Sequence, residues 1–435
     1  MHSDDRRLFA VAVPAFAALI AEPAMILADT VIVGRLGAVE LAALAAGSTV
    51  LLTIVGLCIF LAYGTTASVA RHYGARDDRR AVEVGFSGVW LALGLGLVLA
   101  ALVAVCARQL ATWLSSSPAV AEAATEYVRV AAFSIPAMLV VFACTGALRG
   151  VLDLRSPLVA MVGATIVNIA LTWWFVHGLA WGMTGAAAGL VLAQAGAAAW
   201  LVGRLVMRGR RLGSGLRPRA REILVAAADG VPLFVRTVTL RAALVLATLV
   251  AAGLGDAPLA AHQIATAIVT FLAFALDALA IAAQTLTGQS LGAGDAKRTR
   301  DLTRRVIGWG FVSGVALAVV VAVASPWIAR AFTTDPDVLD VVVPALLVVA
   351  LIQPVSGVVF VLDGVLIGAG DGRFLAVAGL ITLVVYAPVA WTVGALGASF
   401  TWLWAAYCVF QGARFATLWW RQRGDRWLVT GASIR

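Results

Sequence analysis

The stretch that divides the chain is "MRGRRLGSGLRPRARE" (207–222), the longest polar connection in a sequence that is otherwise strongly apolar. Long apolar segments precede it and follow it. Its Gly, Ser, Pro and Arg residues are typical of a loop outside a bilayer rather than of a helix within one. The sequence therefore predicts a linker between two membrane-embedded lobes, an N-terminal lobe over 1–206 and a C-terminal lobe over 223–435.

The composition on either side of the linker is that of a membrane protein. Of the 435 residues, 62% are hydrophobic and 13% are charged, whereas soluble chains are about half apolar and about a quarter charged. Continuous apolar runs indicate an all-α polytopic membrane protein, because a transmembrane β-barrel would show alternation. Twelve spans are predicted, at roughly 8–34, 41–70, 82–107, 119–148, 156–179, 181–206, 223–252, 258–290, 304–328, 337–368, 374–395 and 397–419.

The basic residues indicate the orientation. Most of the 32 Arg and Lys residues lie in the linker, in loops after even-numbered spans or near the termini, Arg414 and Arg435 included. The positive-inside rule then places the linker and both termini in the cytoplasm. The net charge of +9 is therefore explained by topology, and no nucleic-acid partner is predicted.

The two halves are repeats of one another. A shift of 218 residues places Pro14 on Pro232, and it also places "YGARD" (73–77) on "LGAGD" (291–295) and Gly146 on Gly364. Each repeat holds six spans, so both enter the membrane in the same direction. We expect two six-helix bundles related by a pseudo-twofold axis along the membrane normal, with transport by alternating access between them.

Two acids lie inside the first span, in "AEPAMILADTVIVGRLG" (21–37). Glu22 and Asp29 are seven residues apart and share one face of a helix. An ionised carboxylate in a bilayer is costly, so such acids are commonly functional. Asp29 is interpreted as a carboxylate that gains and loses a proton, with a permanently satisfied structural acid as the alternative. Pro23 removes a backbone donor between them and favours bending of the helix.

The remaining intramembrane polar residues suggest two clusters. Asn168, in the fifth span, is a candidate hydrogen-bond partner for Asp29. The C-terminal lobe carries a predicted charge cluster, which is either a structural ion-pair network or a site that responds to substrate or cation. His262 is expected to be an interfacial residue. The acids do not follow the repeat, which suggests that the two lobes have different roles. The charge cluster consists of Arg236, Arg241, Asp277 and Asp363.

Motifs for enzyme chemistry are missing from the sequence. It contains no nucleotide-binding phosphate loop, zinc motif or nucleophile elbow, and its four cysteines show no metal-ligand spacing. We therefore expect a protein that is not an enzyme and has no cofactor. An ion gradient, of H⁺ or alternatively Na⁺, would supply the energy for transport.

Three segments carry a family resemblance. "EPAMILADTVIVGRLG", "AAHQIATAIVTFLAFALDALAIAAQTLTGQSLGAGD" and "LDGVLIGAGDGRFL" resemble the multidrug and toxic compound extrusion (MATE) family, in particular its DinF branch. The resemblance implies an antiporter of the bacterial inner membrane that exports small organic compounds, often cationic or amphiphilic, in exchange for protons or sodium ions. We expect the protein to be a monomer. It also implies that Asp29, in the pattern D-T-x-x-V-G, takes up a proton, and that the first span bends near Pro23 or Pro14.

One position departs from the family pattern. Members of this kind often carry Asn-x-x-x-Asp in the fifth span, whereas here Asn168 is followed by Thr172. A threonine forms hydrogen bonds but does not titrate in the physiological range. Either Asp29 acts alone, or Glu22 supplies the second carboxylate.

The resemblance also leaves alternative functions open. Asp363 matches an acid that other branches associate with cation binding, so a sodium-coupled antiporter is one alternative. A lipid-linked precursor flippase is a second, and a large cationic cavity would favour it. A non-transporting scaffold or receptor is a third, and the intramembrane acids argue against it.

Overall fold

The structure, a computed structural model, describes residues 3–432; Arg435, counted above among the basic residues, lies outside them. The described residues form helices and loops without a strand, which confirms the all-α prediction. The elements are α1 (Ser3–Gly34), α2 (Ala38–Leu57), α3 (Phe60–Gly74), α4 (Asp78–Leu114), α5 (Pro118–Ala131), η1 (Ala132–Ser134), α6 (Ile135–Gly150), α7 (Arg155–Trp173), η2 (Trp174–Gly178), α8 (Gly182–Arg211), α9 (Ala220–Leu254), α10 (Asp256–Gly292), α11 (Ala296–Phe332), α12 (Pro336–Gly368), α13 (Gly372–Ala395) and α14 (Phe400–Arg423).

These helices make up the predicted transmembrane spans. Within residues 3–432, eleven segments are long and apolar enough to cross a membrane, and three of them combine shorter elements: α2 with α3, α5 with η1 and α6, and α7 with η2. The twelfth predicted span corresponds to α14, which is 24 residues long and carries Arg414, Arg421 and Arg423. Its arginine, glutamine, tyrosine and tryptophan residues make it less apolar than the other spans.

The turns of the two halves repeat in the structure. Arg76 and Gly294, which are equivalent under the 218-residue shift, both adopt positive φ, at 62° and 79°. The next residues, Asp77 and Asp295, cap α4 and α11. Each accepts a hydrogen bond from a backbone N–H three residues later, at 3.0 and 2.8 Å. The conserved spacing of the sequence repeat therefore produces the same helix start twice.

A close helix crossing is also built twice. A Cβ atom added to Gly96 would lie 2.6 Å from Cα of Pro136, and one added to Gly314 would lie 2.7 Å from Cα of Pro354. Both pairs obey the 218-residue shift, and they join α4 to α6 and α11 to α12. Small residues permit such close approach of membrane helices, so the lack of a side chain is required at both positions.

The chain divides into two compact units. Unit 1 contains residues 1–16 and 231–435, and unit 2 contains residues 17–230. The divisions fall inside α1 and α9, so each of these helices belongs partly to one unit and partly to the other. The lobes predicted over 1–206 and 223–435 stay a prediction. The predicted linker is shorter than expected, because α8 continues to Arg211 and α9 begins at Ala220.

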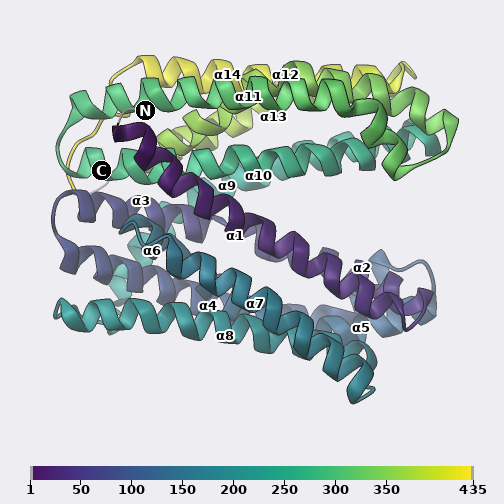
Figure 1. The fold of residues 1–435 in the computed structure, drawn as a ribbon, viewed down its shortest axis with the longest axis horizontal. Helices are drawn as coiled ribbons and strands as arrows, with labels where there is room; N and C mark the ends of the chain where they lie inside the picture. Colours follow the sequence, from purple (N-terminus) through teal and green to yellow (C-terminus); the bar gives the residue numbers. More distant parts are fainter. Residues whose placement is uncertain (1–2, 433–435) are drawn as a thin grey trace. The chain divides into compact units, whose positions relative to one another are not determined.

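Each unit is organised around its equivalent of the fourth span. In unit 1, α12 packs against α10, α11 and α14 (Figure 1), and in unit 2, α6 packs against α3, α4 and α8. The most apolar windows of Pro118–Gly150 and Pro336–Gly368 are 72% and 67% buried, more than those of the other spans. The remaining helices therefore surround these two spans.

Candidate functional site

The first polar site lies in unit 2 beside α1. Glu22, Met25, Ile26 and Asp29 recur at helical spacing and face a small cavity whose other walls come from α2, α5, α6 and α8. The Asp29 residue is only 7% exposed. The cavity offers about 30 Å³ to the centres of water molecules, enough for roughly two of them. Its other lining residues are Leu44, Ser48, Leu51, Leu52, Tyr127, Met138 and Leu190.

Asp29 is held by α7. The side-chain amide Nδ2 of Asn168 donates a 2.7 Å hydrogen bond to Oδ1 of Asp29, which confirms the predicted partnership. Asn168 and Thr172 are completely buried, one turn apart on the same face of α7. Among the described residues, neither Oδ1 of Asn168 nor Oγ1 of Thr172 has a hydrogen-bond partner. The carboxylate therefore has one amide donor in use, and nearby are the unbonded carbonyl oxygen of Asn168, which only accepts, and the Thr172 hydroxyl, which can donate or accept.

α1 is a single helix that runs through both candidate bending positions. It continues without interruption past Pro14 and Pro23, and the division between the two units falls between them, after Phe16. Pro23 lacks the N–H that would bond the carbonyl of residue 19. Thr165 of α7 donates a 3.1 Å hydrogen bond to the carbonyl of Ala21. The Asp29 part of α1 is thus attached to α7 at two points.

Part of the predicted charge cluster is assembled around Asp363. Asp363 of α12 accepts a 3.1 Å hydrogen bond from Nε of Arg236, and its other oxygen accepts one from Nη2 of the same residue. The ion pair expected between these spans is therefore present. Arg241 is exposed and lines a neighbouring cavity, and Asp277 is half-buried on α10.

Arg414 of α14 completes this cluster, and sequence reasoning missed it. Its Nη2 donates a 2.7 Å hydrogen bond to Oδ2 of Asp363, and its Nη1 lies 3.2 Å from Oε1 of Gln411. It was counted with the cytoplasmic basic residues because it lies near the end of the chain. Its position within the apolar run "YCVFQGARFATLWW" is the signal that could have identified it.

A larger cavity lies within unit 1, beside this cluster. It offers about 270 Å³ to the centres of water molecules, within a site lined mainly by apolar and aromatic side chains. Arg241 and Arg414 also line it. The lining residues are Leu240, Arg241, Ala243, Leu244, Ala247, His262, Thr266, Val269, Thr270, Ala273, Phe274, Phe360, Tyr386, Leu403, Trp404, Tyr407, Phe410 and Arg414.

His262 belongs to the wall of this cavity. The prediction of an interfacial residue was wrong, because His262 is 4% exposed and packs against the rings of Phe400 and Trp404. Its Nε2 lies 3.2 Å from Oγ1 of Thr248. Helix α10 begins more than one turn before His262, so the side chain is enclosed by α9 and α14 instead of lying at a helix end.

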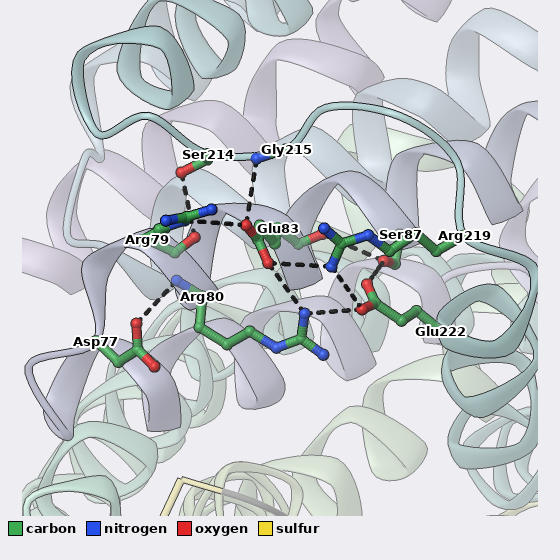
Figure 2. A network of polar contacts seen from close by, with 9 residues as sticks. All are labelled: Asp77, Arg79, Arg80, Glu83, Ser87, Ser214, Gly215, Arg219 and Glu222. Atoms are coloured by element: carbon green, nitrogen blue, oxygen red, sulfur yellow. Dashed lines mark hydrogen bonds and ion pairs between the residues drawn. The ribbon is translucent and has the colours of Figure 1, made fainter.

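A third polar group lies in unit 2 and fixes the loop between α8 and α9. Figure 2 shows that Glu83 of α4 accepts hydrogen bonds from the backbone N–H of Gly215, at 3.2 Å, and from Arg80, at 3.0 Å. Arg80 also bonds Glu222 at the start of α9, at 2.8 Å. Arg219 contacts both acids, at 3.4 and 3.1 Å. The loop and the first turn of α9 are thereby held to α4.

The comparisons with known proteins agree with the duplicated fold. The MatE family model matches twice, at residues 14–174 and 232–392, which are 218 residues apart like the sequence repeat. Protein DETOXIFICATION 44, chloroplastic, of Arabidopsis thaliana is 32% identical, covering 95% of this chain and 81% of its own. DNA damage-inducible protein F of Escherichia coli K12 is 28% identical, in an alignment that covers 98% of this chain and 95% of the E. coli protein.

A solved structure described as "MATE in the bent conformation" shares the fold. It superposes with a TM-score of 0.89 at 21% identity and covers 97% of this chain and 96% of its own. Two matches to one family model, alignments over nearly the whole length and a common fold lead to the same conclusion. The chain belongs to the MatE family, the multidrug and toxic compound extrusion transporters, as its resemblance to the DinF branch predicted.

Proposed function

We propose that this protein exports small organic compounds by alternating access, and that binding of a proton at Asp29 drives export. The observation that carries the proposal is the hydrogen bond of 2.7 Å between Asn168 and Asp29 in a cavity of unit 2. An ionised carboxylate only accepts hydrogen bonds, whereas a protonated one also donates. The unused acceptors on Asn168 and Thr172 offer a place for that new donor.

Protonation would change how α1 is held to α7. With Asp29 ionised, the Asn168 amide bonds to a charged acceptor, which is the stronger kind of hydrogen bond. With Asp29 neutral, that bond weakens and the carboxyl proton turns toward an acceptor such as Oγ1 of Thr172. Because Pro23 lies in the same part of α1, one backbone bond is already missing where the helix would bend. Coupling requires that the proton affinity of Asp29 differs between the two arrangements of α1.

Glu22 is the second acid of the same cavity. It lies two turns before Asp29 and lines the cavity with it. With threonine at position 172, no carboxylate of the fifth span can share the proton with Asp29. We propose that Asp29 is the coupling site, and that Glu22 supports proton entry into the cavity.

Sodium coupling at Asp363 is less well supported than proton coupling at Asp29. Both oxygens of Asp363 already accept hydrogen bonds from guanidinium groups, those of Arg236 and Arg414. A sodium ion needs several oxygen ligands and would be placed next to two positive charges. A structural role for the ion pairs is the proposal that this geometry favours.

A lipid-linked precursor flippase is also less well supported. The unit 1 cavity does contain two arginines, which suit a phosphate group, but its walls are mainly apolar and aromatic. A polar sugar phosphate would leave those walls unused. An amphiphilic compound would use both kinds of surface.

We further propose that the protein lies in a bacterial inner membrane with both termini in the cytoplasm, because the linker and the loops on that side are rich in arginine.

A liposome assay tests the proposed function. Wild-type protein is reconstituted with an imposed pH gradient and without sodium, and the gradient-driven movement of the fluorescent amphiphiles ethidium and 2-naphthoate is followed. Asp29→Asn is compared with Asp340→Asn, which removes an exposed acid of α12. We expect transport by wild type and Asp340→Asn, and none driven by the gradient in Asp29→Asn. Equal gradient-driven transport by all three would reject proton coupling at Asp29.

A further inference from the structure

The unit 1 cavity has an unusual balance of ring surface and charge. Six aromatic side chains line it, and its titratable lining residues are two arginines, one histidine and two tyrosines. No Asp or Glu is found among the described residues that line it. Its interior is therefore apolar with positive charge and without a compensating acid of its own. The aromatic residues are Phe274, Phe360, Tyr386, Trp404, Tyr407 and Phe410.

Arg414 is a fixed positive group in the wall of this cavity. Asp363 and Gln411 hold its guanidinium by hydrogen bonds of 2.7 and 3.2 Å. Its Cζ lies 5.6 Å from the ring centre of Phe360 and 5.8 Å from that of Phe410. Because Asp363 also bonds Arg236, its charge is shared between two guanidinium groups. At this wall one carboxylate is bonded by two guanidinium groups, and the rings of Phe360 and Phe410 lie beside that of Arg414.

Arg241 is the second positive group, and it has a different environment. It is exposed on α9, lines the same cavity, and makes no hydrogen bond or ion pair with any residue that the structure describes. A long arginine side chain without an acidic partner is able to turn toward a ligand. Its planar guanidinium matches carboxylate, sulfonate and phosphate groups in a two-bond geometry.

From this arrangement we propose that the unit 1 cavity binds an organic anion: a compound with a planar apolar body and a carboxylate, sulfonate or phosphate group. The body packs against the aromatic walls, and the anionic group bonds Arg241 and faces Arg414. An organic cation of the same shape would meet two guanidinium charges and no acid. The proposal rests on the proposed export function, because it names the class of compound exported, but binding at this cavity is measurable by itself.

Binding to three matched probes tests the proposal. They are 2-naphthoate, 2-naphthylmethanol and 2-naphthylmethylammonium, which share one ring system and differ in charge. Their affinities for the purified protein in phosphatidylcholine nanodiscs are measured by calorimetry at neutral pH, without any gradient. We expect 2-naphthoate to bind about tenfold or more tightly than the ammonium compound, the factor of one hydrogen bond to a charged group. Equal or tighter binding of the ammonium compound would overturn the proposal.

Variants of Arg241 locate the binding. Arg241→Gln should weaken 2-naphthoate binding about tenfold and leave 2-naphthylmethanol nearly unchanged, and Arg241→Glu should reverse the preference toward the ammonium compound. Arg330→Gln removes an exposed arginine of α11 outside the cavity and should bind like wild type. Unchanged 2-naphthoate binding by both Arg241 variants would refute the site. These measurements need no proton gradient, so their failure is distinguishable from a failure of proton coupling.

A competition experiment identifies the source of the anion. A soluble anionic lipid, dihexanoyl-phosphatidylglycerol, is added to the 2-naphthoate complex, with dihexanoyl-phosphatidylcholine as its control. Displacement by the phosphatidylglycerol alone would support the anion site and point to a lipid headgroup as its occupant. Retention of 2-naphthoate in both lipids would support the site with a small organic anion as the occupant. Displacement by both lipids alike would show apolar competition without recognition of charge and would count against the proposal.

Discussion

The side-chain amide of Asn168 donates a 2.7 Å hydrogen bond to the carboxylate of Asp29, and so joins α7 to α1 at a buried point of unit 2. Thr172, one turn further along α7, contributes a hydroxyl at the position where the family resemblance leads one to expect a second acid. The pair therefore consists of one titratable group and one neutral amide. In the proposed mechanism, the proton is exchanged at a single carboxylate, and the Asn168 amide bonds more strongly to its ionised form than to its protonated form.

Removal of the amide should disturb coupling specifically. In Asn168→Ala the ionised Asp29 loses the hydrogen bond from the Asn168 amide, a change that costs about 1–3 kcal/mol for a buried polar group. We expect a lower gradient-driven rate and an altered dependence of the initial transport rate on external pH. Thr165→Val, which removes the bond to the carbonyl of Ala21 on the same two helices, should keep the wild-type pH profile. The same profile in both variants would contradict the role given to Asn168.

The ion pairs of Asp363 should contribute strongly to the stability of unit 1. Asp363→Asn leaves two buried guanidinium groups facing a neutral amide, and breaking a buried pair in this way typically costs about 3–5 kcal/mol. The control is Asp425→Asn, whose partner Arg300 is 46% exposed, and such surface pairs are worth about 0–1 kcal/mol. Thermal unfolding in detergent should show a large fall in Tm for the first variant and little change for the second. Equal shifts would argue against a structural role for Asp363.

The Glu83 network should protect the loop between α8 and α9 from proteolysis. Glu83→Ala removes the acceptor for Gly215 and one of the two acids that hold Arg219. We expect trypsin to cleave the detergent-solubilised protein after Arg219 several times faster than in wild type. Glu122→Ala, at an exposed position of α5, provides the comparison. If both variants were cleaved at the wild-type rate, Glu83 would not be what holds the loop.

Two glycines of α4 provide a matched test of the helix crossing. A methyl group at Gly96 would lie 2.6 Å from Cα of Pro136, whereas nothing lies within 4 Å of one at Gly94. Gly96→Ala should lower the Tm, because the helices of unit 2 must separate to admit the methyl group. Gly94→Ala should be neutral or slightly stabilising, by up to about 1 kcal/mol, since alanine favours helix. Similar Tm values for the two variants would show that α4 and α6 do not pack as closely as described.

Much of the fold was predictable because apolar length and the repeat are local properties of the sequence. The spans follow from runs of apolar residues, and the shared register of Pro136 and Pro354 predicts one architecture used twice. The break at Cys58 and Ile59 between α2 and α3 was not predicted. Both residues are apolar, so hydropathy gives no sign of a turn there.

The sites were only partly predictable, for a different reason. The pairing of Asp29 with Asn168 was predicted because an acid inside the membrane needs a hydrogen-bond donor, and the amide of Asn168 supplies one within the fifth span. The contact of Arg414 with Asp363 was not predicted. The place of Arg414 near the chain end suggested a cytoplasmic residue, whereas its contacts depend on which face of α14 packs against α12. Likewise Arg241 was grouped with Arg236, although five residues of helix turn the two side chains toward different surroundings.

The most direct test of coupling at Asp29 is to let substrate drive protons. Proteoliposomes enclosing the pH-sensitive dye pyranine, with equal pH on both sides and no sodium, are given an outside excess of a compound that wild-type protein transports. Wild type and Asp340→Asn should move protons outward as the compound enters, which raises the internal pH. Asp29→Asn should admit the compound without a pH change. An internal pH rise of wild-type size in Asp29→Asn would contradict the central claim that the proton is carried at this carboxylate.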